Sequence, residues 1–143
     1  MNQVGKKRIL IIEDAEGITK GYKVILEKEG YETNVCVSGE DAKLRIEKGQ
    51  KYDLAIVDLV LPTENPEKRT LKDCEETGLR LIKRMIDKNT CRRFYVITVR
   101  NSLKKRVERL CKSKKTALTF EHKLDYEPEH LASKTLRLLD KQI

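Results

Sequence analysis

Three acidic residues follow two short apolar segments of the sequence. Glu13 and Asp14 come directly after residues 9–12, and Asp58 comes directly after residues 54–57. Both segments are rich in aliphatic and β-branched side chains, which is typical of strands buried on both faces of a parallel sheet. Like charges at one sheet edge repel and raise one another's pKa, so they make a poor core. They make a good oxygen-ligand site for a hard divalent cation, which we expect at the carboxyl edge of the sheet.

The rest of the chain provides strands and helices that would position these carboxylates. Strands are predicted, from composition and alternation, at residues 8–12, 32–37, 54–59, 94–99 and 117–121. Helices are predicted at residues 15–29, between Ser38 and Gly49, at 78–88, after Asn101 or Ser102, and after Pro128. This alternation predicts an α/β fold with helices on both faces of a parallel sheet. The commonest small arrangement is the flavodoxin-like three-layer sandwich, with five strands in the order 2-1-3-4-5 and five helices.

Length and composition exclude several classes of protein. At 143 residues we expect one domain spanning 1–143, with a core at about 7–139. The apolar runs are too short to span a bilayer, and the N-terminus lacks the apolar core of a signal peptide. The four cysteines are widely spaced, which predicts reduced thiols rather than a disulfide or zinc framework. We therefore expect a cytoplasmic protein without membrane contact.

Residues 63–77 do not fit the alternating pattern. They are polar, and they join the third strand to its helix by a connection longer than usual. We expect an insertion here. It is either a surface loop without a role or a lid or docking loop beside the carboxylates.

In their order along the chain, the residues at the strand ends resemble those of the receiver domain of bacterial two-component response regulators. The family includes the chemotaxis response regulator, and the similarity extends from about residue 7 to 139. Glu13-Asp14 resembles the acidic pair of the family, and residues 58–62, Asp-Leu-Val-Leu-Pro, resemble its D-x-x-[ML]-P motif. Three further residues fall at the positions of the switch hydroxyl, the switch aromatic and the site lysine: Thr98, Phe120 and Lys123.

The resemblance implies a phosphoacceptor function. Asp58 would accept a phosphoryl group from a sensor histidine kinase or a phosphotransfer protein. Mg²⁺ would be held by Glu13, Asp14, Asp58 and the backbone carbonyl of Val60. The domain would be regulatory rather than an enzyme, catalysing only its own phosphotransfer and dephosphorylation.

The resemblance also implies a switch. Lys123 would add positive charge beside the phosphoryl group, and Thr98 would donate a hydrogen bond to it. Movement of Thr98 would leave space for Phe120, which would couple the site to the surface around the fourth and fifth helices.

Four positions depart from the family pattern. Leu124 stands where proline usually follows the lysine, so we expect a trans peptide bond there. Val99 replaces the usual small residue, and Arg100 is a bulky charge that either tunes dephosphorylation or is simply solvated. Gly78, the counterpart of a glycine usually found a few residues after the phosphoacceptor, lies twenty positions after Asp58.

Three other functions are compatible with an aspartate at the end of a buried strand in an α/β fold. A haloacid-dehalogenase-like phosphotransferase usually has a second aspartate where this chain has Val60. A flavin or dinucleotide protein needs a phosphate cradle after the first strand, whereas residues 13–17 are acidic there. The main alternative is a pseudo-receiver, an interaction module that acts without phosphorylation.

The charge of the chain predicts an acidic partner. The net charge is +8, and thirteen Lys or Arg residues and only two acids fall in residues 83–115. The helix after the fourth strand carries Lys104, Lys105, Arg106, Arg109 and Lys112. We expect this face either to dock a downstream protein with an acidic surface or to be a solvated basic face. Direct nucleic-acid binding is not expected, because no recognition motif is present and aromatic residues are scarce.

Overall fold

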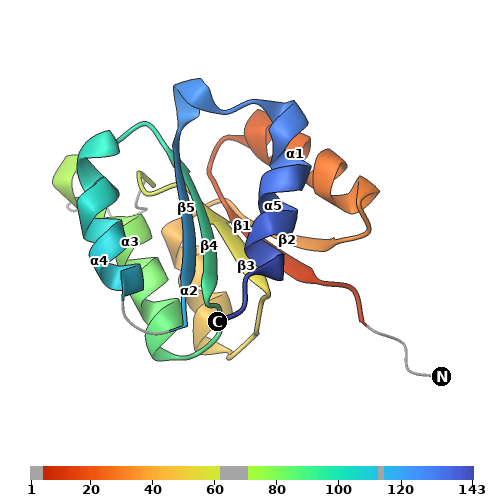
Figure 1. The fold of residues 1–143 in the computed structure, drawn as a ribbon. Helices are drawn as coiled ribbons and strands as arrows, with labels where there is room; N and C mark the ends of the chain where they lie inside the picture. The colour runs from red at the N-terminus through yellow and green to blue at the C-terminus, as the bar shows by residue number, and fades with distance from the viewer. Residues whose placement is uncertain (1–4, 62–70, 113–114) are drawn as a thin grey trace.

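A computed structural model describes residues 5–61, 71–112 and 115–143 of the chain (Figure 1). Five parallel strands form one sheet: β1 (Arg8–Ile12), β2 (Glu32–Cys36), β3 (Leu54–Val57), β4 (Arg93–Thr98) and β5 (Ala117–His122). Their spatial order is β2-β1-β3-β4-β5, which confirms the predicted topology. The helices that connect them are α1 (Glu16–Lys28), α2 (Gly39–Glu47), α3 (Leu71–Asp87), α4 (Lys104–Lys112) and α5 (Leu131–Asp140).

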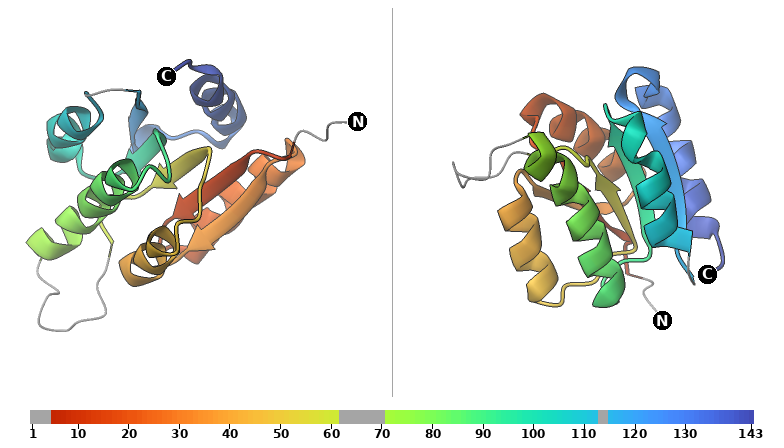
Figure 2. Two further views of the ribbon diagram at one scale, coloured as in Figure 1. Left: turned by 90° about the horizontal axis from the view of Figure 1, so that it is seen from below. Right: turned by 90° about the vertical axis from the view of Figure 1, so that its left-hand side faces the viewer.

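The sheet separates two apolar layers. Along β1, Leu10 and Ile12 pack into the layer beneath α2, α3 and α4, whereas Ile9 and Ile11 pack into the layer beneath α1 and α5. Figure 2 shows α2, α3 and α4 side by side on one face of the sheet. Successive side chains of a strand point to opposite faces, so an uninterrupted apolar strand supplies both layers.

Local signals set most of the helix ends. The Ser38 hydroxyl accepts a hydrogen bond from Asp41 N at 3.1 Å and caps α2, as predicted. Gly30 and Gly49, which follow the ends of α1 and α2, have φ values of +89° and +75°. Glycine adopts this left-handed conformation without a Cβ penalty, which explains why both helices stop there.

The prediction that the third helix begins at Gly78 is wrong. α3 begins at Leu71, so the C-terminal part of the predicted insertion at 63–77 is helical. An ion pair between Glu76 and Arg80, with 2.8 Å between Oε2 and NH2, spans one turn across the predicted boundary. Sequence reasoning missed this start because residues 71–77 have little apolar periodicity. Residues 63–70 of the predicted insertion, and Pro62 before them, lie outside the described residues.

Three 3-10 turns lie in the two connections that link β4 to α4 and β5 to α5 in the described part of the chain. The turns are η2 (Asn101–Leu103), η3 (Lys123–Asp125) and η4 (Pro128–His130). All four cysteines are free thiols, and burial raises the pKa of Cys36 and Cys91 to about 12. Among the described helices, none has the length and apolar character needed to cross a membrane.

Candidate functional site

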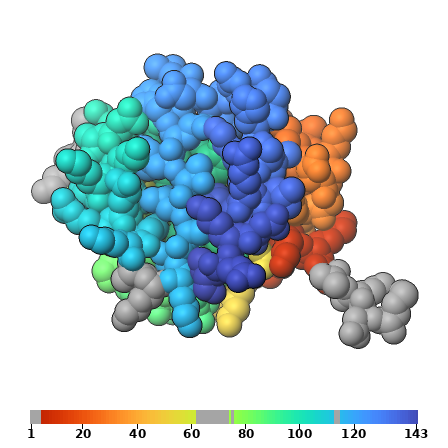
Figure 3. Space-filling view, viewed as in Figure 1, coloured from red at the N-terminus to blue at the C-terminus, as the bar shows by residue number. Residues whose placement is uncertain are grey.

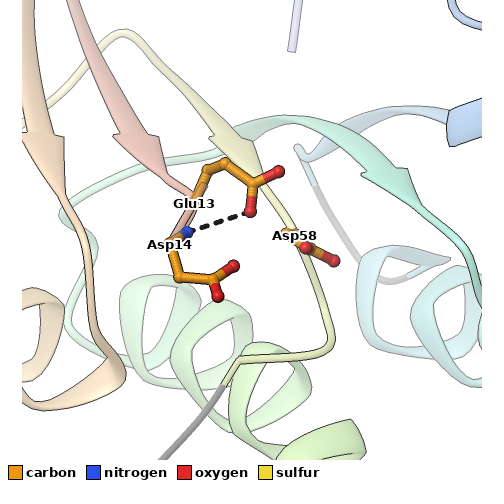
Figure 4. Close-up of side chains that lie close together, drawn as sticks. All are labelled: Glu13, Asp14 and Asp58. Atoms are coloured by element: carbon orange, nitrogen blue, oxygen red, sulfur yellow. Dashed lines mark hydrogen bonds between the residues drawn. The ribbon is translucent and has the colours of Figure 1, made fainter. Parts of the chain in front are cut away.

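Glu13, Asp14 and Asp58 lie together at the carboxyl edge of the sheet. Glu13 and Asp14 follow β1, and Asp58 follows β3 (Figure 4). One carboxylate oxygen from each residue lies within 4.8 Å of the other two. Glu13 and Asp58 are buried, whereas Asp14 is exposed. The convergence predicted from the two apolar segments is therefore present.

Backbone hydrogen bonds hold these carboxylates in place. Asp58 N donates to the carbonyl oxygen of Ile12 at 2.9 Å, and Glu13 N donates to that of Cys36 at 3.1 Å. Each acidic residue thus extends the ladder between its strand and a neighbour. Asp58 Oδ1 also accepts a hydrogen bond from Val60 N at 3.1 Å, which fixes the side chain above the end of β3.

Lys123 joins the two buried carboxylates. Its Nζ donates to Asp58 Oδ2 at 2.8 Å and lies 2.6 Å from Glu13 Oε1. The lysine follows β5 directly, and the pairing Thr98↔His122 aligns the ends of β4 and β5. The structure thus places Lys123 beside the two buried carboxylates, and its role stays a prediction.

Burial and mutual contacts shift the pKa values of Glu13 and Lys123. Desolvation, together with the nearby charge of Asp58, raises the pKa of Glu13 from 4.5 to about 7, although the contact with Lys123 acts in the opposite direction. For Lys123, burial alone would lower the pKa. The hydrogen bonds with Asp58 and Glu13 outweigh burial, and its pKa lies above the ordinary value. The ammonium form of Lys123 is therefore favoured beside Asp58.

The two predicted switch residues lie on the face of the sheet that packs under α4. Thr98 ends β4 and is fully buried, and its Oγ1 accepts a hydrogen bond from Arg100 N at 3.4 Å. Phe120 is half-buried on β5, opposite Val96, and packs against the apolar layer beneath α4. Thr98 and Phe120 are thus diagonal neighbours on one face of adjacent strands.

Gly78 is part of this site despite its distance in sequence from Asp58. A Cβ atom at Gly78 would lie 2.4 Å from Leu59 Cα and 2.9 Å from the carbonyl oxygen of Asp58. Gly78 N also donates to the carbonyl oxygen of Leu59 at 3.1 Å. Only glycine allows α3 to touch the backbone that carries Asp58. A glycine inside a helical pattern was the available signal for this contact.

Sequence reasoning did not identify His122 as a site residue. Its Nε2 lies 3.1 Å from the carbonyl oxygen of Val99, and its Nδ1 accepts a hydrogen bond from Leu124 N at 3.0 Å. The peptide bond between Lys123 and Leu124 is trans, as predicted. Leu124 has the N–H that a proline would lack, so the departure from the family pattern creates a hydrogen bond in this chain.

Comparison with known proteins is consistent with this arrangement. A family model of the response regulator receiver domain matches residues 9–119. The chain is similar to the structure of a CheY-like response regulator receiver domain protein from Methanospirillum hungatei, with 24% identity, a TM-score of 0.72 and 95% of each chain covered. It is also similar to the response regulator TrrA from Thermotoga maritima, solved in complex with Mg²⁺ and BeF. That match has 21% identity and a TM-score of 0.67, and it covers 92% of this chain and 98% of TrrA.

A further similar structure is that of the chemotaxis protein CheY4 from Vibrio cholerae. Its identity is 20% and its TM-score is 0.67, over 94% of this chain and 99% of that protein. At such identities the structural matches establish a common fold. The family model, in contrast, extends from the first strand into the last one.

Proposed function

Because the chain belongs to the family of response regulator receiver domains, we propose that it receives a phosphoryl group on Asp58 in two-component signalling. The observation that carries this proposal is the buried Asp58 carboxylate, which is held by Lys123 beside Glu13 and Asp14. The donor is a sensor histidine kinase or a histidine-containing phosphotransfer protein. A carboxylate oxygen of Asp58 forms the new bond to phosphorus, the bond from phosphorus to the donor histidine nitrogen breaks, and that nitrogen keeps the electron pair.

The residues around Asp58 prepare it for this transfer. Val60 N and Lys123 Nζ each bind one carboxylate oxygen, so the side chain cannot rotate freely. The ammonium group of Lys123 stays beside the transferred group and offsets part of its negative charge. Gly78 holds the backbone of Asp58 and Leu59 against α3, which limits movement of the nucleophile.

The donor set fits Mg²⁺. The three carboxylates offer hard oxygen ligands within 4.8 Å of one another, and with Lys123 they leave two negative charges when fully ionised. Glu13, Asp14 and Asp58 would hold the ion, with the carbonyl of Val60 as a further ligand. When bound, Mg²⁺ neutralises charge on the phosphoryl oxygens. A receiver domain that binds Mg²⁺ and BeF, TrrA, has the same fold.

Thr98 and Phe120 are the proposed switch. The Thr98 hydroxyl would leave its contact with Arg100 N and donate to a phosphoryl oxygen, and Phe120 would then occupy the space that becomes available. Both residues lie under α4, so this change would alter the surface around α4, β5 and α5. Figure 3 shows these three elements forming one continuous face of the molecule.

The α4 side of this face would bind an acidic surface of a downstream protein. Arg106 pairs with Glu76, and none of Lys104, Lys105, Arg109 and Lys112 is seen to pair with a carboxylate whose side chain the structure describes. Lys105, Arg109 and Lys112 line a shallow hollow of about 560 Å³ between α4 and β5. Three cations and one acid, Glu108, line the hollow, and this excess of positive charge favours an anionic partner mainly through the association rate and selectivity.

A pseudo-receiver function is the second candidate. The observation in its favour is Leu124, the residue that replaces the usual proline after Lys123. In that case the same fold would bind its partners without a phosphoryl group on Asp58.

Intact-mass analysis after incubation with acetyl phosphate and Mg²⁺ separates the two candidates. The phosphoacceptor predicts one added phosphoryl group, which Asp58→Asn abolishes. The matched control is Asp140→Asn, because Asp140 is exposed at the end of α5 and far from the site in the fold. Unaltered mass of the wild-type protein, or equal labelling of the Asp58→Asn variant, would reject phosphorylation at Asp58.

A further inference from the structure

His122 connects two loops that each carry a residue of the candidate site. The loop after β4 begins with Val99, directly after Thr98, and the turn after β5 begins with Lys123. The imidazole lies between them, with Nε2 3.1 Å from Val99 O and Nδ1 3.0 Å from Leu124 N. One side chain therefore contacts the backbone next to Thr98 and the backbone next to Lys123.

The two partners of His122 fix its protonation state. Leu124 N–H can only donate a hydrogen bond, so Nδ1 must be the unprotonated nitrogen. The carbonyl oxygen of Val99 can only accept, so Nε2 must carry the proton. Both contacts together require the neutral imidazole with its proton on Nε2.

The side chains of Val99 and Leu124, whose backbone atoms contact the imidazole, do not anchor the two loops. Val99 is 49% exposed and Leu124 is 87% exposed, so burial of these side chains does not fix the backbone at either position. The two hydrogen bonds of His122 therefore link the loop after β4 to the turn after β5 directly. The N–H of Leu124 is essential to it, because a proline at this position has no donor.

We propose that His122 is a positioning residue that fixes the distance between Thr98 and Lys123. This inference rests on the proposed phosphoacceptor function, since it assigns His122 a role in presenting these two side chains to the phosphoryl group. Lys123 contacts Asp58 directly, and Thr98 ends the neighbouring strand. A group that holds both loops keeps the ammonium and the hydroxyl aligned before phosphoryl transfer.

If His122 only capped the turn η3, its variants would behave differently. As the residue before η3, His122 accepts from Leu124 N, and that bond alone would cap the turn. The amide oxygen of asparagine occupies the place of Nδ1, so His122→Asn keeps the cap and loses the contact with Val99. The amide nitrogen of glutamine reaches the place of Nε2, so His122→Gln keeps the contact with Val99 and loses the cap.

The test measures the rate of Asp58 phosphorylation by acetyl phosphate with Mg²⁺ for His122→Asn, His122→Gln and His122→Ala. We expect all three to be slower by about 10-fold, the scale found when groups that orient a site residue are removed. His130→Asn is the control, because His130 is exposed and its ring lies 3.2 Å from Glu127 rather than beside the candidate site. Thermal melts of each variant separate slower phosphorylation from unfolding.

A second arm asks whether His122 acts through Lys123. In a Lys123→Ala background, His122→Ala should reduce the rate by less than 2-fold, because one of the two groups whose distance it fixes is absent. A wild-type rate for His122→Asn, or a full additional 10-fold loss in the double variant, would overturn the inference.

The link made by His122 can also be tested if Asp58 proves not to be phosphorylated. If wild-type protein is not phosphorylated, amide and imidazole NMR still tests the connection without a phosphodonor. The proton should be on Nε2, and His122→Asn should shift the amide signals of both Thr98 and Lys123. Unshifted Thr98 and Lys123 signals would also overturn the inference.

Discussion

Lys123 Nζ lies 2.8 Å from Asp58 Oδ2, and the two residues are separated by 65 positions in the chain. The contact pairs a buried carboxylate with an ammonium group whose own pKa is raised by that pairing. Because Glu13 is the second partner of the same ammonium, one lysine offsets the charge of two buried acids.

Lys123→Met should destabilise the metal-free protein. The substitution leaves the two buried carboxylates without a counterion, and we expect a loss of roughly 2 to 3 kcal/mol at pH 7.5. Lys20→Met is the control, since Lys20 pairs with Glu16 on the exposed face of α1 and should contribute almost nothing. Urea denaturation measures both. Equal stability of the two variants would mean that Lys123 does not offset the buried charge.

The stability of the metal-free protein should depend on the protonation of Glu13. Its pKa in the folded state is raised from 4.5 to about 7. Protons bind the folded state more tightly, so this carboxyl group stabilises the fold as the pH falls from above 7 to about 4.5, with no further gain below. A carboxyl-carbon NMR titration should give a midpoint near 7 for Glu13, and exposed Glu16 is the control. A midpoint for Glu13 close to 4.5 would contradict the proposed effect of burial.

Asp14→Ala should weaken Mg²⁺ binding by at least about 10-fold, because it removes one of three clustered oxygen ligands. Glu16→Ala should leave the affinity nearly unchanged, since Glu16 lies on α1 and pairs with Lys20 at 3.2 Å. Calorimetric titration suits a chain without tryptophan. Without metal, Asp14→Ala should also raise the midpoint of thermal unfolding slightly, because like-charge repulsion is relieved. Equal losses of affinity in the two variants would mean that the metal binds elsewhere.

Gly78→Ala should destabilise the protein by about 1 to 3 kcal/mol, the usual range for added atoms without space. The new methyl group would meet Leu59 Cα at 2.4 Å, and either α3 or the backbone of Asp58 must move. Gly21→Ala is the matched control, because no atom lies within 4 Å of the Cβ position at Gly21 and alanine favours the helix. Chemical denaturation should therefore give opposite signs for the two substitutions. If Gly78→Ala left the free energy of unfolding unchanged, α3 and the backbone of Leu59 would be able to move apart at little cost.

Reversing charge on α4 should remove a protein partner. Lys104→Glu, Lys105→Glu and Arg106→Glu together should abolish capture of an acidic protein that is released by high salt. The matched control reverses Lys20, Lys23 and Lys28 on α1, which keeps the net charge equal. Binding to arbitrary DNA with a steep dependence on salt, without a protein partner, would instead indicate a nucleic-acid surface.

Part of the fold follows from the sequence because β1 and β3 are apolar along nearly their whole length and because Gly30, Ser38 and Gly49 mark helix ends. Ile9–Ile12 and residues 54–57 each supply both layers of the core, so composition alone identified them. The start of α3 was missed since residues 71–77 have few apolar side chains. An ion pair and contacts with the loop after β3 stabilise that part of the helix.

The site residues that could be predicted from the sequence are those that end or directly follow a strand. Glu13, Asp14, Asp58 and Lys123 occupy such positions, and parallel strands bring their carboxyl ends to one edge. His122 was not predicted as a site residue, and Gly78 was recognised only as the counterpart of a family glycine, because both act through contacts with backbone that is distant in the sequence. Such contacts depend on the register of β4 with β5 and on the approach of α3 to Leu59.

The two backbone hydrogen bonds between the loop after β3 and α3 also define a site for protein engineering. Leu61 N donates to Cys74 O at 3.1 Å, and Gly78 N donates to Leu59 O at 3.1 Å. These bonds close the ends of the connection, so its length can change without displacing Asp58. In general, doubling the length of a loop costs only about 0.6 kcal/mol in closure entropy. A reporter peptide inserted between Leu61 and Leu71 should therefore add an optical probe to this tryptophan-free chain while leaving Asp58 in place.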